Sequence, residues 1–290
     1  MDTKGVFMKE KHKAIGVFDS GLGGLTCVAE LMRLMPGEDI IYFGDTARVP
    51  YGTRSRETIL EYTAQDVGFV RSKDVKLIIA ACGTVSSAIG TDKALAAELA
   101  GNTPFMGVVV PAAEEACKAT KNGVIGVIGT QATISSGAYE QAIHALCSDA
   151  KTVSAACPLF VPMVENGITD KDDIVVRAMT ERYLSPVKAS GADVLILGCT
   201  HYPHLIEAVR DYMGEGVTLV SSGAAAARKA CSVLGEAHLH TDSTKGTLTC
   251  YTSDSEELFD RNAHRFIGKD LICTVNKVSV DELQRFHERT

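Results

Sequence analysis

Short apolar runs alternate with longer alanine-rich stretches along most of the chain, and this alternation constrains the fold more than any other feature. Strands of a parallel sheet read as continuous apolar runs because helices cover both faces of the sheet. The intervening stretches have the length and composition of helices that join such strands. We therefore predict an α/β fold with parallel sheets. The expected strands are 14–18, 39–43, 76–80, 105–109, 123–128, 152–155, 194–197, 218–220, 247–251 and 272–275, and the expected helices are 25–34, 53–73, 91–100, 112–120, 136–145, 171–190 and 224–234.

Two pairs of similar segments indicate that the chain contains two related α/β halves. LIIAACGT (77–84) and VLILGCT (194–200) are both aliphatic strands that lead into a cysteine and a threonine. IGVFDSG (15–21) and IGVIGT (125–130) both end in a small, polar turn. Ligand sites of open α/β sheets form beyond the carboxyl ends of the strands, where these turns lie. The pattern predicts a site in a cleft between the halves.

Two changes along the chain predict where the halves meet. One boundary falls at Val110–Pro111, where an expected strand ends in proline, and another falls at 214–216, before the strand that leads into Ser221. From the residues alone, the segment after 216 either forms a domain of its own or returns to the first half.

Charge and hydropathy exclude several classes of partner. The 290-residue chain has 29 basic and 36 acidic residues and a net charge of −7, whereas a sequence-independent nucleic-acid binder needs a positive excess. Its apolar runs are far shorter than the roughly 20 residues that span a bilayer, and the run after the basic N-terminal segment is too short for an export signal. Nine scattered cysteines then read as reduced thiols. We expect a cytoplasmic protein with no nucleic-acid or membrane partner.

Cys82 and Cys199 are the most informative candidates, because each follows an expected buried strand in the equivalent position of a related half. Two thiols facing one molecule from opposite sides suit an inversion, in which one removes a proton from a carbon and the other returns a proton to the opposite face. A buried cysteine more often acts as a small apolar residue. We keep that interpretation for the other seven: Cys27, Cys117, Cys147, Cys157, Cys231, Cys250 and Cys273.

Asp19 and His201 are the candidate partners of these thiols. Asp19 ends the first strand in DSGLGG, and His201 lies two residues after Cys199. A histidine accepts protons or stabilises a thiolate, while Asp19 also suits the cap of the helix at Leu25. The glycine spacing does not match a phosphate loop. Without CxxC or HExxH, Cys199, His201 and His204 do not form a convincing zinc site, so we expect no metal.

Seven motifs occur in an order that resembles the glutamate racemases, the cofactor-independent members of the aspartate/glutamate racemase superfamily. They extend over about residues 14–223, and DSGLGG, DTARVPYG and GCTHYP favour glutamate over aspartate. The motifs are FDSGLGGLT (18–26), YFGDTARVPYG (42–52), AACGT (80–84), GVVVPA (107–112), IGTxATxxS (128–136), CPLFVPMVENG (157–167) and LGCTHYPHL (197–205).

The resemblance implies two flavodoxin-like domains, doubly wound with mostly parallel sheets, related by pseudo-twofold symmetry around a site in the cleft. Residues 1–110 and 217–290 would form the first domain and 111–216 the second. The implied activity interconverts L- and D-glutamate with two cysteine bases and no cofactor, supplying D-glutamate for peptidoglycan. The resemblance further implies a homodimer, with the small-molecule substrate as its other partner.

The resemblance also implies residue roles. Cys82 would act on the D-enantiomer with help from Asp19, and Cys199 on the L-enantiomer with help from His201 and Glu165. The implied substrate-binding residues are Ser20, Pro50, Tyr51, Gly52, Gly83, Thr84, Thr133 and Thr200.

Gly83 departs from the family pattern, in which an asparagine that helps hold the substrate follows the first cysteine. Its absence removes a side-chain donor and acceptor from the site, and Val85 in place of the more usual alanine is a second, milder change. Two alternatives therefore stay open. One is a racemase for aspartate or another amino acid, and the other is a non-catalytic protein that binds an amino acid.

Overall fold

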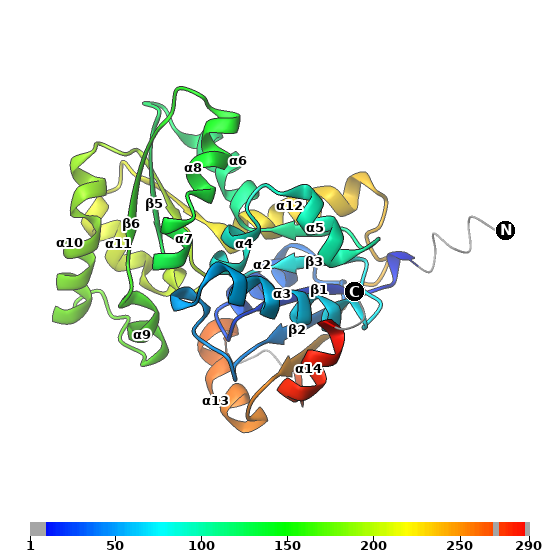
Figure 1. Ribbon diagram of the computed structural model, residues 1–290. Coiled ribbons are helices and arrows are strands. Elements are labelled where there is room, and N and C mark those ends of the chain that lie inside the picture. Colours follow the sequence, from blue (N-terminus) through cyan, green and yellow to red (C-terminus); the bar gives the residue numbers. More distant parts are fainter. Residues whose placement is uncertain (1–9, 269–272, 288–290) are drawn as a thin grey trace.

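Two parallel sheets form the framework of the computed structural model, which describes residues 10–268 and 273–287 (Figure 1). All ten expected strands are present, with ends within two residues of those expected. The first residue of the expected strand 272–275 lies outside the described ranges. Residues 1–9 of the basic N-terminal segment also lie outside them. The first sheet has the order β10(Thr274–Lys277)-β9(Leu248–Thr252)-β2(Ile40–Gly44)-β1(Ile15–Asp19)-β3(Leu77–Ala80)-β4(Phe105–Gly107), and the second has the order β6(Lys151–Ala156)-β5(Val124–Gly129)-β7(Val194–Leu197)-β8(Thr218–Ser221).

The two sheets repeat one strand order. In the first, β2-β1-β3-β4 stand side by side, and β6-β5-β7-β8 repeat that arrangement in the second. This is the order of flavodoxin-like folds, so the predicted fold class is confirmed. Among the residues that the structure describes, only the first sheet is extended, by β9 and β10. Leu248 of β9 pairs with Ile40 of β2, so the C-terminal segment returns to the first half.

Close packing of a helix on a glycine occurs at equivalent places in both halves. A Cβ atom on Gly16 in β1 would lie 2.4 Å from a methyl of Val70, and one on Gly126 in β5 would lie 2.4 Å from a methyl of Val187. The valines lie in α3 and α10, which cover the two sheets. The repeated IGV segments of the sequence therefore have the same structural role in both halves.

The structure corrects the predicted boundaries between the halves. β8 was expected to belong with 217–290, but Thr218 pairs with Val194, which places this strand in the second sheet. The predicted boundary at 110 falls inside α6, which begins at Val109, and the strand before it ends at Gly107 instead of 109. α12, which begins at Ser222, packs against α2 of the first half and α6 of the second, so the chain crosses back along this helix.

Helices cover the sheets, and several begin at polar caps. Ser55, Asp92, Asp173, Ser221 and Ser255 each accept a hydrogen bond from a backbone N–H in the first turn of their helix. The helices are α2(Leu25–Leu34), α3(Arg56–Arg71), α4(Gly83–Ile89), α5(Lys93–Ala100), α6(Val109–Ala119), α7(Gln131–Ser135), α8(Ala138–Leu146), α9(Phe160–Glu165), α10(Ile174–Ala189), α11(Ile206–Met213), α12(Ser222–Glu236), α13(Glu256–Ile267) and α14(Val280–His287), with short 3₁₀ helices η1(Tyr51–Thr53) and η2(Tyr202–Leu205).

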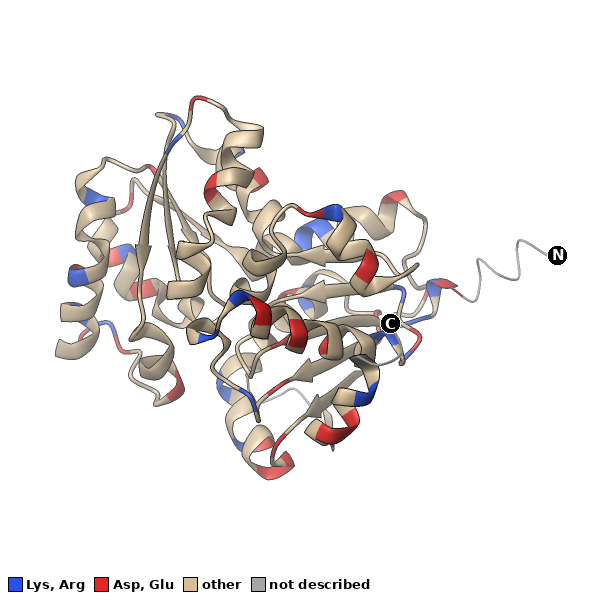
Figure 2. Ribbon diagram, in the orientation of Figure 1, with Lys and Arg blue, Asp and Glu red and all other residues tan. Residues whose placement is uncertain are grey.

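The apolar core lies between the sheets and these helices, and β1, β3 and β7 are buried along their whole length. Figure 2 shows acidic and basic residues intermixed on the outer helices of both halves. Within residues 10–268 and 273–287, no helix is long and apolar enough to cross a membrane.

Candidate active site

A cavity of about 240 Å³ lies between the halves, at the carboxyl ends of the central strands. Ser20 directly follows β1, Thr130 follows β5, and the two cysteines come two residues after β3 and β7. The predicted cleft is therefore a real cavity, and most of the predicted residues meet there. Its lining comprises Ser20, Val49, Pro50, Tyr51, Gly52, Thr53, Cys82, Gly83, Thr84, Thr130, Gln131, Cys157, Pro158, Val161, Pro162, Glu165, Cys199, Thr200 and His201.

Cys82 belongs to the first half and occupies the N-cap position of α4, without a capping hydrogen bond from its side chain. Its side chain is buried, and its Sγ lies 3.5 Å from the hydroxyl of Ser20. Burial and the nearby charge of Asp19 raise the pKa of the Cys82 thiol to about 12, although the Ser20 contact acts in the opposite direction. Without substrate, Cys82 therefore keeps its proton at neutral pH and can act as a proton donor.

Cys199 lies in the second half, beside His201. The sulfur is 3.9 Å from Nδ1 of His201, and Nε2 of the same ring is 3.4 Å from a carboxylate oxygen of Glu165. Burial lowers the pKa of His201, but the neighbouring side chains of Cys199 and Glu165 outweigh it and raise the pKa to about 10. His201 therefore carries a positive charge at neutral pH and presents it to the sulfur.

Asp19 lies behind the cavity and does not line it. Its carboxylate accepts hydrogen bonds from the N–H of Gly21 at 2.9 Å and from the hydroxyl of Thr200 at 3.4 Å. Burial raises the pKa of Asp19, and the charge of His201 acts against that rise. Asp19 therefore affects the pKa of Cys82 electrostatically, without a hydrogen bond to the sulfur. Its hydrogen bond with Thr200 joins the two halves.

Thr133 is also behind the wall, contrary to its expected place among the substrate-binding residues. It is buried, and its hydroxyl lies 3.0 Å from that of Thr130. Thr130 lines the cavity and faces the hydroxyl of Thr84 at 3.0 Å. Thr130 was not among the predicted residues, although it follows β5 as Ser20 follows β1, and this equivalence could have identified it.

The segment that carries Pro50, Tyr51 and Gly52 is anchored by a buried polar network. Arg48 forms ion pairs with Asp45 at 2.6 Å and with Asp66 at 3.0 Å. The hydroxyl of Tyr51 donates to Asp66 at 3.0 Å. The Val49–Pro50 peptide bond is cis. The network fixes this loop against α3, so its residues hold one wall of the cavity in place.

The polar groups of the cavity suit a small zwitterion. Among the described residues that line it, none is a lysine or arginine, and the charged members are Glu165 and His201. Hydroxyl groups of Ser20, Thr84, Thr130 and Thr200 can bind carboxylates through hydrogen bonds. In the described ranges, no group of three or more His, Cys, Asp or Glu residues is arranged to hold a metal ion.

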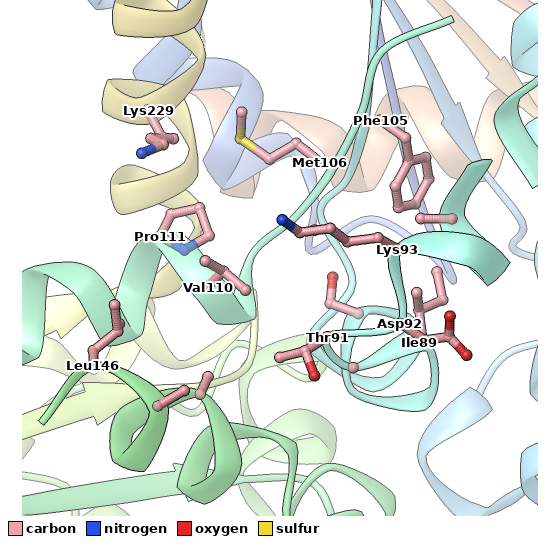
Figure 3. A pocket seen from close by; sticks show the side chains of 16 residues that line it. Ile89, Thr91, Asp92, Lys93, Phe105, Met106, Val110, Pro111, Leu146 and Lys229 are labelled. Atoms are coloured by element: carbon pink, nitrogen blue, oxygen red, sulfur yellow. The ribbon is translucent and has the colours of Figure 1, made fainter. Parts of the chain in front are cut away.

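A second cavity, of about 360 Å³, also lies between the halves (Figure 3). Its wall is mainly apolar, with Phe105, Met106 and Leu146, and Lys93 extends across it. It contains neither of the two candidate thiols. We therefore assign the chemistry to the smaller cavity.

Comparisons with known proteins show which family the chain is similar to. The family model described as Asp/Glu/Hydantoin racemase matches residues 23–230. A glutamate racemase of Geobacter metallireducens is 44% identical over 260 residues, which cover 89% of this chain and 94% of the relative.

Solved structures have the same architecture. A glutamate racemase isoform of Bacillus anthracis superimposes with a TM-score of 0.86 at 38% identity, covering 93% of this chain and 98% of the other. A glutamate racemase of Francisella tularensis in complex with D-glutamate gives 0.85 at 35% identity, covering 93% and 99%.

Proposed function

The chain belongs to the Asp/Glu/Hydantoin racemase family as an amino-acid racemase of the glutamate racemase type, and from this premise we propose that it inverts glutamate with two cysteines and no cofactor. One observation carries the proposal: Cys82 and Cys199 occupy equivalent positions of the two halves and line the same cavity. A planar carbanion between them can be protonated from either side, which is what an inversion requires.

In the direction from L- to D-glutamate, Cys199 as a thiolate takes the proton from the α-carbon. The electron pair that remains is delocalised into the α-carboxylate. The thiol of Cys82 then donates its proton to the opposite face of the carbon, so a C–H bond is broken and another is formed with no net oxidation. Afterwards Cys199 carries the proton and Cys82 is the thiolate, which is the arrangement required for D-glutamate.

The partners of the two thiols fit these roles. His201, whose pKa is raised by its contacts with Cys199 and Glu165, would offer a positive charge to the Cys199 thiolate. Cys82 starts as a thiol because burial and Asp19 raise its pKa. In the reverse direction Asp19, whose own pKa is raised by burial, assists Cys82.

Hydroxyl groups and backbone N–H groups would hold the two carboxylates of glutamate. Ser20, Thr84 and Thr200 line the cavity near the thiols, and Thr130 adds a fourth hydroxyl. Oriented dipoles of this kind stabilise the charge that develops on the α-carboxylate during proton removal. We include Pro50, Tyr51, Gly52 and Gly83 in the binding surface, and leave Thr133 as a support of Thr130.

The wider setting is part of the same proposal. We propose that the D-glutamate formed here supplies peptidoglycan synthesis, that the protein acts in the cytoplasm, and that it forms a homodimer. The domain division is proposed as one unit built on the six-stranded sheet and one built on the four-stranded sheet, with the return crossing along α12.

Proton NMR in D₂O with L-glutamate and no added cofactor tests the reaction. Loss of the α-proton signal together with formation of D-glutamate is expected for the wild-type protein. Cys82→Ser and Cys199→Ser should each lose almost all activity, while Cys147→Ser, at a half-buried cysteine outside the cavity, should keep it. Full activity in either cavity variant would refute the two-cysteine mechanism.

A panel of amino acids separates this proposal from the alternatives. Inversion of aspartate or another amino acid, with glutamate left unchanged, would reassign the substrate. Thermal stabilisation by glutamate without exchange of its α-proton would instead indicate a binding protein.

A further inference from the structure

Two half-buried cysteines lie side by side in the helix layer of the second half, away from the cavity that contains Cys82 and Cys199. Cys117 belongs to the last turn of α6, and Cys147 directly follows α8. The Cys117 sulfur lies 3.8 Å from the carbonyl oxygen of Ile143, and the backbone N–H of Cys147 donates to that same oxygen at 2.7 Å. Because both contacts share one atom, they hold Cys117 next to Cys147.

Alanines at the contact between α6 and α8 explain this proximity. Ala113 and Ala116 of α6 and Ala142 of α8 are buried in one apolar cluster, against which both cysteines pack. The distance between two packed helices depends on the side chains at their contact, and alanine allows a close approach. A side chain in the last turn of one helix can therefore reach the residue that follows the other.

The two thiols interact directly, and their surroundings differ. Burial and the neighbouring thiol of Cys147 raise the pKa of the Cys117 thiol to about 12, so Cys117 keeps its proton at neutral pH. The thiolate is the form of cysteine that attacks an oxidant. We therefore assign the first attack to Cys147, which is followed by the exposed residues Ser148 and Asp149.

We propose that Cys117 and Cys147 form a redox-active dithiol that a small hydroperoxide converts into a disulfide between α6 and α8. This modification site is independent of the proposed racemisation, because neither cysteine lines the cavity of Cys82 and Cys199. In a reducing compartment such a bond forms only transiently, so both thiols are free in the resting protein.

The oxidation proceeds in two balanced steps. The Cys147 thiolate attacks one oxygen of the hydroperoxide, the O–O bond breaks, and the departing oxygen takes up the proton that Cys147 released. The hydroperoxide becomes an alcohol, or water when it is hydrogen peroxide, and Cys147 becomes a sulfenic acid. The sulfur of Cys117 then attacks the sulfur of Cys147, and hydroxide leaves with the Cys117 proton as water. Two electrons thus pass from the two thiols to the hydroperoxide.

The disulfide would close a loop of the chain that contains β5, α7 and α8. A cross-link of this kind restricts the unfolded chain, and it stabilises the folded state when the native geometry is kept. The oxidised protein should therefore unfold at a temperature a few degrees above that of the reduced protein. The bond would also join the two helices that contribute Pro111 and Leu146 to the wall of the larger cavity.

Peptide mapping after a limited dose of hydrogen peroxide tests the proposal. Trypsin cleaves after lysine and arginine, so Cys117 lies in the peptide 94–118 and Cys147 in the peptide 122–151, each with no other cysteine. Without reduction, we expect the two peptides to be joined and the intact protein to be lighter by two hydrogen atoms. Dithiothreitol should release both peptides and restore the original mass.

Single variants assign the role of each thiol. Cys117→Ser and Cys147→Ser should both lose the joined peptides and the rise in melting temperature. In Cys117→Ser, oxidation of Cys147 should stop at the sulfenic acid, or continue to the sulfinic acid with excess peroxide. The matched control is Cys231→Ser, at a half-buried cysteine of α12, which should form the disulfide as the wild-type protein does.

The outcomes separate the proposal from random oxidation. Joined peptides with a higher melting temperature in the wild-type protein and in Cys231→Ser, and in neither of the other variants, support it. Unchanged thiols, a sulfinic acid at Cys147 of the wild-type protein without joined peptides, a bond from either cysteine to a different partner, or a bond that lowers the melting temperature overturns it. Racemisation is measured separately before oxidation, so its failure would overturn the proposed function and leave this result intact.

Discussion

Replacing Glu165 by glutamine should move the alkaline limb of the activity profile to lower pH. The carboxylate of Glu165 lies 3.4 Å from Nε2 of His201 and stabilises the protonated ring. Glutamine keeps the shape and removes the charge. Because a carboxylate favours the cationic form of a neighbouring imidazole, its loss lowers the pKa of His201 from its value of about 10.

The size of the shift follows from distance and exposure. At 3.4 Å, two unit charges interact by about 1 kcal/mol in a water-like dielectric and by about 5 kcal/mol at an effective dielectric constant of about 20. The side chain of Glu165 is 46% exposed, so the lower end applies. About 1.4 kcal/mol corresponds to one pKa unit, and the limb should therefore move down by about one pH unit.

The assay is kcat/KM for L-glutamate as a function of pH, for which the proposed mechanism needs His201 protonated. Activity should fall as pH rises through the pKa of His201, and it should fall earlier in Glu165→Gln. Glu207→Gln makes the same chemical change on an exposed face of α11 and should leave the profile unchanged. The amino group of the substrate titrates identically in all three proteins. An alkaline limb that stays in place, or moves upward, would refute the role given to Glu165.

Three further changes test the supports of the site. Arg48→Leu leaves the carboxylate of Asp66 buried without its cation, so we expect a loss of about 3–5 kcal/mol in unfolding free energy, measured by urea denaturation. Gly23→Ala would place a Cβ atom 2.2 Å from the hydroxyl oxygen of Thr200 and 2.5 Å from Nδ1 of His201, so it should lower kcat/KM at least tenfold and, by overpacking these buried side chains, cost about 1–3 kcal/mol in unfolding free energy, measured by urea denaturation. Phe266→Leu removes a ring packed edge-on at 5.4 Å from His201 and should cost about 1–2 kcal/mol in stability, seen in thermal unfolding.

The strands could be predicted because buried strands consist of continuous runs of apolar residues. β1, β3 and β7 are covered on both faces, so every residue in them is apolar or small, apart from Asp19 at the end of β1. Three short helices, α4, α7 and α9, were not predicted, because they begin inside the loops that line the cavity. Nor were α11, α13 and α14, although α13 carries buried apolar residues at helical spacing.

The candidate site was predictable to the extent that it repeats between the halves. Cys82 and Cys199 follow equivalent strands, and their meeting at one cavity follows from the shared strand order. The close approach of Gly83 to Gly198, where a Cβ atom on Gly83 would lie 2.0 Å from the carbonyl oxygen of Gly198, could not be predicted, because it joins segments far apart in sequence across the boundary of two sheets. For the same reason, the sequence did not reveal that Asp19 accepts a hydrogen bond from Thr200 of the other half.

The two halves share a topology but place different side chains near their thiols, a histidine beside Cys199 and an aspartate near Cys82, and the proposed reaction gives a reason. Enantiomers have equal free energies in water, so kcat/KM must be equal in the two directions, whatever groups the protein uses. This equality does not fix which of the two cysteines carries the proton in the unbound protein. A histidine with a pKa of about 10 lies beside Cys199, whereas burial and the nearby Asp19 raise the pKa of the Cys82 thiol to about 12, so the unbound site favours a protonated Cys82. Two identical thiols with identical surroundings would share the proton equally, and only half of the unbound molecules would then be ready for a given enantiomer.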